Sequence, residues 1–435
     1  MTGLSGHAIL EFSLFVAGFN SMLVLLCGTA FLASSARSLK STTTHTRSKL
    51  AVVTATSGVL LVLSLSILLI AARSAQASGK SPFMSWVGFR HMFGRMFATE
   101  DQDKLRLAEF VALEPIDTHT HIAQTSPEFV AMLERLHLHV LDILYVDNTN
   151  PYRSSLDRQK QDALEFVASS KGLAKLSTTF DPFQLNDPGF SQNTIEELNE
   201  DFERGAIAVK VWKNIGMQLK NASRLYVMFD DPAFQPIYQD IAAHNKTLII
   251  HAADPDPAWT GVDPARYYAA DPEWDMTKKP GAPSKKAILD ARDRVLAMNP
   301  GLRVVGAHLG SMETPLDDLA VCLDHYPNFA VDTAARVDTL TQQPIQKVRA
   351  FILKYQDRIL YGSDFSFDSE LRHKGMTPEV WESRYLLDWR YFSTDDVFEY
   401  HGRRVEGLNL PLPVLEKLYH DNAVRWIPGI DANAH

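Results

Sequence analysis

The 435-residue sequence predicts a (β/α)8 TIM barrel preceded by two N-terminal transmembrane helices. After residue 112, short β-branched runs alternate eight times with amphipathic stretches, a pattern typical of parallel strands joined by helices. Polar residues recur at the C-terminal ends of these runs, where such barrels carry their functional sites. Near the N-terminus, residues 50–72 hold no charge, and 23 uncharged residues are enough to cross a bilayer.

The predicted anchor consists of two apolar segments, residues 8–33 and 50–72. The loop between them has four basic residues and no acidic one, so the positive-inside rule predicts a cytoplasmic loop and an extracytoplasmic barrel. We therefore interpret residues 1–75 as a two-helix membrane anchor and residues 76–111 as a juxtamembrane linker. A small-residue motif that ends at Ala77 supports an alternative, in which a signal peptide is removed near Ala77 and an exported soluble protein remains.

Charge is distributed unevenly along the chain. Eight basic residues and one acidic residue give residues 1–98 a net charge of +7, so the overall charge of −9 leaves −16 for the rest. A strongly acidic soluble part disfavours nucleic acid as a partner. The two cysteines, Cys27 and Cys322, are too few for a disulfide framework.

The predicted barrel domain spans residues 112–430 and contains eight strands and eight helices. No GxGxxG motif follows the first strand, which disfavours a doubly wound open sheet. The predicted strands are residues 115–121, 141–148, 174–181, 206–213, 247–253, 302–310, 329–335 and 359–365. The predicted helices are residues 126–139, 154–170, 194–204, 232–245, 282–299, 315–326, 346–358 and, after a longer connection, 412–426.

Two histidines, His119 and His121, stand two apart at the end of the first predicted strand. Side chains at positions i and i+2 of a strand point to the same face, so these imidazoles should enter one space. Neutral imidazole is the commonest protein ligand of catalytic transition metals. Other strands end in residues of ligand or proton-transfer type, namely Lys210 on the fourth, His251 on the fifth, His308 on the sixth and Asp364 on the eighth.

Alternation along the strands predicts the direction of these side chains. In the fourth strand it places Ile207, Val209 and Val211 against the helices, and Ala206, Ala208 and Lys210 toward the barrel axis. In the sixth strand it places Val305 and Ala307 on one side and His308 on the other, facing the axis.

The order HxH, Lys, His, His and Asp across strands 1, 4, 5, 6 and 8 resembles the amidohydrolase superfamily of metal-dependent barrels. Four stretches resemble its amidohydrolase-related branch, which includes aminocarboxymuconate-semialdehyde and gamma-resorcylate decarboxylases and lactone hydrolases. These stretches are Asp117–His121, Val304–Ser311, Tyr361–Phe365 and His420–Ala423. The resemblance covers residues 112–428 and does not extend to residues 1–111.

The resemblance implies one or two divalent ions, with Zn²⁺ expected and Mn²⁺ as the alternative. It implies that Asp364 and His308 are catalytic, and that His308 ligates a second metal or polarises the substrate. In two-metal relatives the lysine that matches Lys210 is carbamylated and bridges the ions, whereas one-metal relatives need no lysine ligand; both alternatives stay open. The implied ligands of the first metal are His119, His121, His251 and Asp364.

Residues 253–283 form a long loop rich in proline, aspartate and aromatic residues after the fifth predicted strand, and long loops at this rim usually carry specificity. Asp332 and Arg336 follow the seventh strand, and we interpret them as a structural ion pair or a clamp for a substrate carboxylate. Contacts with the substrate are predicted for Trp212, Lys213, Arg266, Trp274 and Arg336.

The sequence thus predicts a membrane-anchored, metal-dependent hydrolase that attacks a small ester, lactone or amide with metal-activated water. The first alternative is a metal-dependent, non-oxidative decarboxylase of an aromatic or unsaturated carboxylic acid, which would use the same ligands. The second is a catalytically inactive, membrane-tethered binding protein, although none of the six rim residues is missing. The expected partners are a small-molecule substrate and a membrane, and homo-oligomerisation is left open.

Overall fold

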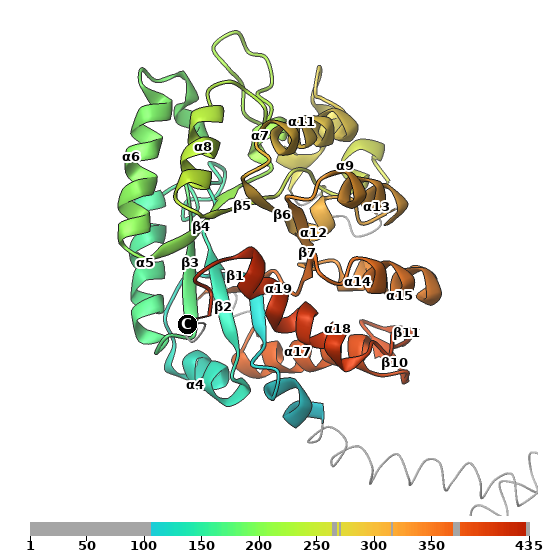
Figure 1. Ribbon diagram of the computed structural model, residues 1–435. Helices are drawn as coiled ribbons and strands as arrows, with labels where there is room; N and C mark the ends of the chain where they lie inside the picture. The colour runs from blue at the N-terminus through green and yellow to red at the C-terminus, as the bar shows by residue number, and fades with distance from the viewer. Residues whose placement is uncertain (1–105, 263–267, 269–270, 315, 369–374, 432–435) are drawn as a thin grey trace, which may run out of the picture. The chain divides into compact units, whose positions relative to one another are not determined.

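The computed structural model describes residues 106–262, 268, 271–314, 316–368 and 375–431 (Figure 1). The predicted membrane segments, the motif near Ala77 and the linker up to residue 105 lie outside these ranges. Within the ranges, no helix combines the length and the apolar character that crossing a bilayer requires. The chain divides into two compact units, and the barrel belongs to the second, Leu105–His435.

A parallel sheet that closes on itself forms the barrel. The eighth predicted strand is split into β8 and β9, of which β8 pairs with β7 and β9 pairs with β1. Between the two halves, the carbonyl oxygen of Tyr361 accepts a hydrogen bond from the Thr118 amide at 3.0 Å. The strands are β1 (Ile116–Ile122), β2 (His139–Ile143), β3 (Ala174–Thr179), β4 (Ala206–Val211), β5 (Thr247–Ile250), β6 (Arg303–Gly306), β7 (Phe329–Asp332), β8 (Ile359–Leu360) and β9 (Phe365–Phe367).

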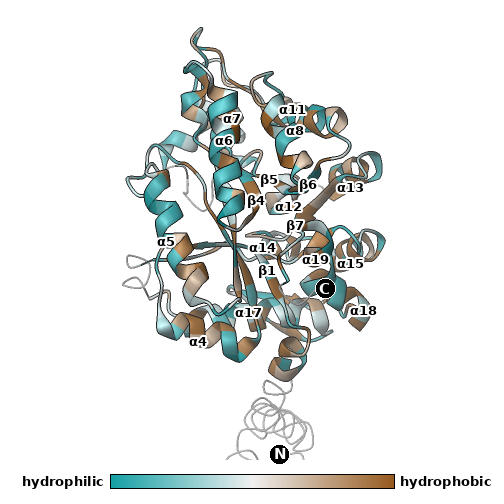
Figure 2. Ribbon diagram, turned by 60° about the vertical axis from the view of Figure 1, so that its left-hand side comes forward, coloured by the Kyte–Doolittle hydropathy of each residue, from teal (hydrophilic) through white to brown (hydrophobic). Residues whose placement is uncertain are grey.

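Helices follow the strands and cover the outside of the sheet, and their exposed faces are hydrophilic, as α5 and α6 show in Figure 2. The predicted α/β alternation is therefore confirmed. The principal helices are α4 (Pro127–Leu136), α5 (Leu156–Ser169), α6 (Phe190–Glu203), α8 (Gln235–Ala243), α11 (Lys285–Met298), α13 (Leu316–His325) and α15 (Ile345–Lys354). Short turns are η1 (Pro182–Asn186), α7 (Asn214–Met217), α9 (Pro257–Thr260), η2 (Pro272–Trp274), η3 (Met276–Lys278), α12 (Ala307–Gly310) and α14 (Val337–Leu340).

Side-chain caps fix where several of these helices begin. The Ser126 hydroxyl accepts a hydrogen bond from the Phe129 amide before α4, and the Ser284 hydroxyl accepts one from the Ala287 amide before α11. Each cap satisfies one of the amides that the first helical turn leaves without an intrahelical partner.

The connection between strand 8 and the last helical segment has structure of its own that the sequence did not predict. It contains the helix α17 (Pro378–Ser393) and a hairpin of β10 (Val397–Tyr400) and β11 (Arg403–Glu406). These elements lie beside the last segment in Figure 1. The last segment runs through α18 (Leu412–Glu416), the π-turn η4 (Lys417–Asp421) and α19 (Asn422–Trp426).

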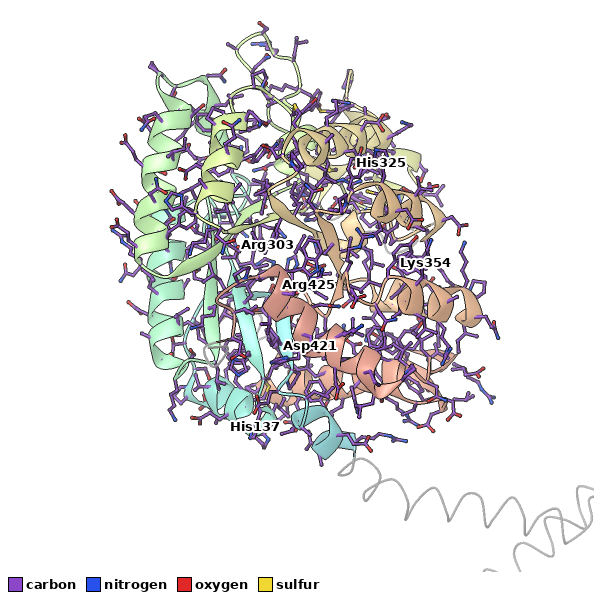
Figure 3. All side chains as sticks on the ribbon, in the orientation of Figure 1. His137, Arg303, His325, Lys354, Asp421 and Arg425 are labelled. Atoms are coloured by element: carbon purple, nitrogen blue, oxygen red, sulfur yellow. The ribbon has the colours of Figure 1, made fainter. Side chains whose placement is uncertain are left out.

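The last segment packs against the interior core of the barrel. Ala423, Trp426 and Ile427 join a buried cluster with inward side chains of β1, β2 and β4 to β8. The side-chain Nδ2 of Asn422 donates hydrogen bonds to the carbonyl oxygens of Gln356 and Ile359 at 2.7 and 2.8 Å. These bonds connect the segment to β8. The exposed Asp421 and Arg425, labelled in Figure 3, occupy the solvent side of the same segment.

The predicted side-chain directions are wrong in part of two strands, β4 and β6. In β4 the error comes from a β-bulge. Leu176 pairs with Ala206 but the next residue, Ser177, pairs with Ala208, so Ile207 is an extra residue in β4. A bulge inverts the alternation that precedes it. Ile207 therefore joins the interior cluster, while Ala206 packs with the α5 residue Ala163 on the outside.

The second error concerns β6. Val305 and Ala307 belong to the interior cluster, although the alternation had placed them opposite His308. His308 still faces the axis because it adopts a left-handed conformation, with φ of 59° and ψ of 49°, and so does Leu309. A left-handed residue redirects the chain and ends strand alternation.

Helix α17 carries a buried carboxylate, Asp388, between two phenols. The Tyr400 and Tyr361 hydroxyls donate hydrogen bonds to its Oδ1 and Oδ2 at 2.6 and 2.8 Å. Burial nevertheless dominates and raises the pKa of Asp388 to about 6. The folded chain therefore holds a proton at Asp388 at pH values where the unfolded chain has lost it.

We predict that Asp388→Asn changes how stability depends on pH. Because the folded state binds more protons between about pH 4 and pH 6, the wild-type free energy of unfolding should fall as the pH rises through that window, by up to about 3 kcal/mol from this group. Asparagine does not titrate. In urea denaturation of the metal-free chains at pH 4, 5, 6 and 7, the free energy of unfolding of the variant should therefore rise relative to that of the wild type as the pH increases. The exposed Asp395→Asn is the matched control, and parallel pH curves for wild type and Asp388→Asn would contradict the prediction.

Candidate metal centre

The two histidines of β1 reach the barrel axis with the help of a second bulge. The register of β1 against β2 shifts by one residue between Asp117 and Thr120. As a result, Ile116 fills the interior core while His119 and His121, an odd number of residues further along, also face the axis. The two rings are 5.2 Å apart, so the predicted pairing of these side chains on one face is found.

Asp364 meets these histidines from the break in the eighth strand. Its Oδ1 is 3.3 Å from Nε2 of His121 and 3.5 Å from Nε2 of His119. Asp364 has a φ of 65°, and its amide donates a hydrogen bond to the His119 carbonyl oxygen at 2.9 Å. The backbone of β1 therefore positions the carboxylate directly.

A buried carboxylate, Asp117, holds the turn before Asp364. Its Oδ1 accepts hydrogen bonds from the amides of His119 and Ser363, each at 3.0 Å. Its Oδ2 accepts from the hydroxyls of Ser363 and Tyr385. The same side chain thus links the strand that carries His119 to the turn that carries Asp364.

His308 completes a compact set of ligand atoms. One ligand atom from each of His119, His308 and Asp364 lies within 4.8 Å of the other two. The His308 amide donates a hydrogen bond to Oδ1 of Asp332 at 2.7 Å, which supports the left-handed turn. His308 thus belongs to the same group of side chains as the residues predicted to bind the first metal.

His251 and Lys210 border this set. The His251 ring is 4.2 Å from the His308 ring, and Lys210 Nζ is 3.1 Å from His119 Nε2. His251 Nε2 is buried and has no hydrogen-bond partner among the residues that the structure describes, and Oδ1 of Asp254 lies 3.7 Å from it. An unpartnered buried nitrogen costs about 1–3 kcal/mol, a cost that a metal ion would remove.

The Nδ1 atoms of three imidazoles are held by hydrogen bonds, so the Nε2 atom of each ring faces the centre, where Lys210 Nζ contacts that of His119. Nδ1 of His119 lies 2.8 Å from Oδ2 of Asp332, Nδ1 of His121 lies 2.7 Å from the Ile143 carbonyl oxygen, and Nδ1 of His308 lies 2.9 Å from the Ala334 carbonyl oxygen. Since these partners are acceptors, each Nδ1 carries the proton and each Nε2 presents a lone pair. Metal-binding histidines are commonly oriented by such contacts.

The surroundings keep three imidazoles and the Asp364 carboxylate in the protonation states that a cation requires. It lowers the pKa of His121 to about 4 and holds the pKa values of His251 and His308 well below the ordinary value, so these imidazoles are neutral near pH 7. Burial also lowers the pKa of Lys210 to about 8. For Asp364, burial alone would raise the pKa, but the adjacent imidazoles outweigh it and lower the pKa, so the carboxylate is ionised. Neutral imidazoles with a carboxylate suit Zn²⁺ and similar ions.

Asp332 is the carboxylate that orients His119. Burial would raise its pKa, but the contacts with His119 and the proximity of His308 and Lys210 lower it, so it remains ionised. The sequence had suggested an ion pair of Asp332 with Arg336, and this pair is not formed. The carboxylate nearest to Arg336 is instead Glu313, with Nε and Oε2 3.8 Å apart.

The predicted substrate contacts lie in different surroundings. Trp212 packs against Trp274 with ring centroids 4.9 Å apart, and its ring is 6.4 Å from that of His251. Lys213 Nζ lies 2.8 Å from both oxygens of Asp254 and 4.3 Å from the Trp274 ring centre. Arg336 is nearly buried and Arg266 lies outside the described residues. Trp212, Lys213, Trp274 and Arg336 therefore remain predictions.

Two residues near the centre were missed by the sequence interpretation. The Tyr145 ring lies 5.0 Å from the His121 ring and 4.6 Å from the Trp212 ring, with the Arg153 guanidinium 4.6 Å above it. The predicted second strand extended to residue 148, whereas β2 ends at Ile143. With the correct boundary, Tyr145 would have stood out as a strand-end residue.

Comparison with known proteins identifies one family. The family model described as Amidohydrolase matches residues 173–428. No curated protein matches the chain. Three solved structures, each covering 72% of this chain at 14% identity, are an uncharacterized TIM-barrel protein from Bordetella bronchiseptica (TM-score 0.43, 97% of that chain), 2,6-dihydroxybenzoate decarboxylase from Rhizobium (0.41, 98%) and 5-carboxyvanillate decarboxylase from Sphingomonas paucimobilis (0.39, 98%).

We predict that Asp332→Asn weakens metal binding without unfolding the chain. The asparagine oxygen can still accept from the amides of His308 and Ala334, so the loss is confined to the carboxylate that holds His119 Nδ1. Loss of such a contact typically costs about 10- to 100-fold in metal affinity. Titration of the metal-free chain with Zn²⁺ against a chelating dye measures the change. The exposed Asp324→Asn serves as control, and equal affinities for Asp332→Asn and wild type would refute the orienting role.

Proposed function

Because this chain belongs to the amidohydrolase family, whose model matches residues 173–428 of 435, we propose that it is a metal-dependent hydrolase of a small ester, lactone or amide. The observation that carries the proposal is the convergence of His119, His308 and Asp364 within 4.8 Å of one another. Family membership makes the chain an enzyme, and the substrate and the reaction are the proposed part.

The residues that would hold the cation are His119, His308 and Asp364, with His121 and His251 around them. A bound Zn²⁺ would lower the pKa of water from about 15.7 toward about 7 and polarise a substrate carbonyl. The orphaned His251 Nε2, the neutral imidazoles and the buried carboxylates that brace them support this assignment.

Asp364 has the properties of the proton carrier. It is ionised, and its side chain is 29% exposed, whereas that of His119 is 1% exposed. A substrate can therefore approach Asp364 while the histidines stay shielded from water. During attack, the carboxylate accepts the proton of the water, and it returns this proton to the leaving oxygen or nitrogen.

The position of the barrel relative to the membrane is a separate proposal. The charge-free segment 50–72 and the basic loop before it support an anchor at residues 1–75 with the barrel outside the cytoplasm. Protease protection in sealed membrane vesicles tests this arrangement, because a protected full-length chain in right-side-out vesicles would exclude it.

We predict that Asp364→Asn lowers kcat by about 10²- to 10⁴-fold, since asparagine cannot carry the proton, while the thermal unfolding temperature changes little. Hydrolysis of a panel of lactones, esters and amides by the Zn²⁺-loaded full-length chain measures the effect. Chelator treatment should abolish the activity and added metal should restore it.

The matched control is Asp317→Asn, whose carboxylate is 76% exposed and pairs with Lys347 on the surface of the barrel. It should keep wild-type turnover. Full activity of purified Asp364→Asn would exclude this residue as the proton carrier. Release of CO₂ from aromatic carboxylic acids, with no hydrolysis of the panel, would replace the hydrolase by the decarboxylase.

A further inference from the structure

A cavity of about 390 Å³ lies against the exposed side of Asp364. Its walls come from the turn that carries Asp364, from the chain around α14, from α17 and from the β10–β11 hairpin. The helix and the hairpin belong to the connection after strand 8. The cavity is therefore built partly by the connection after strand 8, whose structure the sequence alternation did not predict.

The position of the cavity suits a molecule that reaches the exposed side of Asp364. Among the clustered side chains, Asp364 lines the cavity and is also the most exposed, at 29%. A molecule that reaches Asp364 from this side has the remainder of its structure in the cavity. The side chains of Val337 and Phe365 give this space an apolar lining.

Arg384, on α17, provides the positive charge of the cavity. Its guanidinium lies 5.3 Å from the ring centre of Phe365. Its Nε is buried and has no hydrogen-bond partner, and no carboxylate within the described ranges forms an ion pair with it. A guanidinium has five N–H donors in a fixed plane, a geometry that matches a carboxylate, so an unpaired one beside a cavity fits an anionic ligand.

The carboxylates around the cavity are already engaged. Each oxygen of Asp388 accepts a hydrogen bond from a tyrosine hydroxyl. Asp338 forms an ion pair with Arg403 and lies 3.4 Å from His401 Nδ1. Asp364 faces the imidazoles of β1. Among the described residues that line the cavity, Arg384 is therefore a charged group that a ligand can satisfy.

We propose that Arg384 binds a carboxylate of the substrate at a distance from the bond that is cleaved, and that the apolar walls hold the carbon skeleton between the two. The substrate class is then a small ester, lactone or amide that also carries a carboxylate. The cleavage part of this statement rests on the proposed function, whereas the anion site can be measured by itself.

The first experiment measures binding to the full-length, Zn²⁺-loaded chain by calorimetry, with phenylacetate and its neutral counterpart phenylacetamide as probes. The wild type should prefer phenylacetate. Arg384→Gln should weaken phenylacetate binding about 10- to 100-fold, as expected for the loss of a charge-assisted pair, and leave phenylacetamide unchanged. Arg384→Lys should recover part of the affinity, which also covers the case in which Arg384→Gln does not fold.

The matched control is Arg404→Gln. Arg404 is exposed on β11 and does not line the cavity, so this substitution removes the same charge at a site outside the cavity. It should bind phenylacetate as the wild type does. The proposal is overturned if the wild type shows no preference between the probes, if neither Arg384 variant weakens phenylacetate binding, or if Arg404→Gln weakens it equally.

The second experiment separates the two proposals by turnover of mono-4-nitrophenyl glutarate and 4-nitrophenyl butyrate. The wild type should prefer the glutarate ester, and Arg384→Gln should lose this preference through a higher KM. If neither ester is hydrolysed while the phenylacetate preference persists, the hydrolase assignment fails and the anion site stands. If both are hydrolysed and Arg384→Gln keeps the preference, the anion site fails and the hydrolase stands.

Discussion

The closure of the sheet between β1 and the broken eighth strand is the constraint on which the metal centre depends. The Thr118 amide binds the Tyr361 carbonyl oxygen, and the Asp364 amide binds the His119 carbonyl oxygen. These two bonds bring the first and the last strand of the barrel together where their side chains must meet. Because the strand breaks at this point, the Asp364 carboxylate turns toward the imidazoles instead of following the pleat.

Two buried carboxylates, Asp117 and Asp332, hold the residues of the metal centre in place through hydrogen bonds. Asp117 connects β1 to the turn before Asp364, and Asp332 accepts from His119 and from the His308 amide. Burying a carboxylate is costly unless its oxygens are satisfied, and both side chains are fully engaged. The positions of the ligand side chains thus depend on hydrogen bonds between strands that are far apart in the sequence. The cavity beside Asp364 has a different origin, since the connection after strand 8 builds one part of its wall.

The sequence interpretation succeeded where a rule of local geometry applied. The HxH spacing predicted that His119 and His121 share a face, and the order of strand ends predicted that His251, His308 and Asp364 meet them. It failed where one residue altered the alternation. The bulge at Ile207 reversed the direction of Ala206. The left-handed turn at His308 lets this residue face the barrel axis together with Val305, which alternation had placed on the opposite side. Bulges and left-handed residues depend on the pairing of neighbouring strands, which no local pattern records.

By itself, the sequence determined the α/β class, the order of the strands and the types of residue at their ends, because alternation of apolar residues and the position of polar ones are local properties. Only the tertiary structure decided that Asp332 orients His119 and does not pair with Arg336. It also decided that α17 places Arg384, which forms no ion pair within the described residues, in the wall of the cavity that Asp364 lines. His119 and Asp332 lie more than 200 residues apart, and Arg384 lies on a connection whose helix the sequence pattern did not predict, so these contacts arise only when the barrel closes.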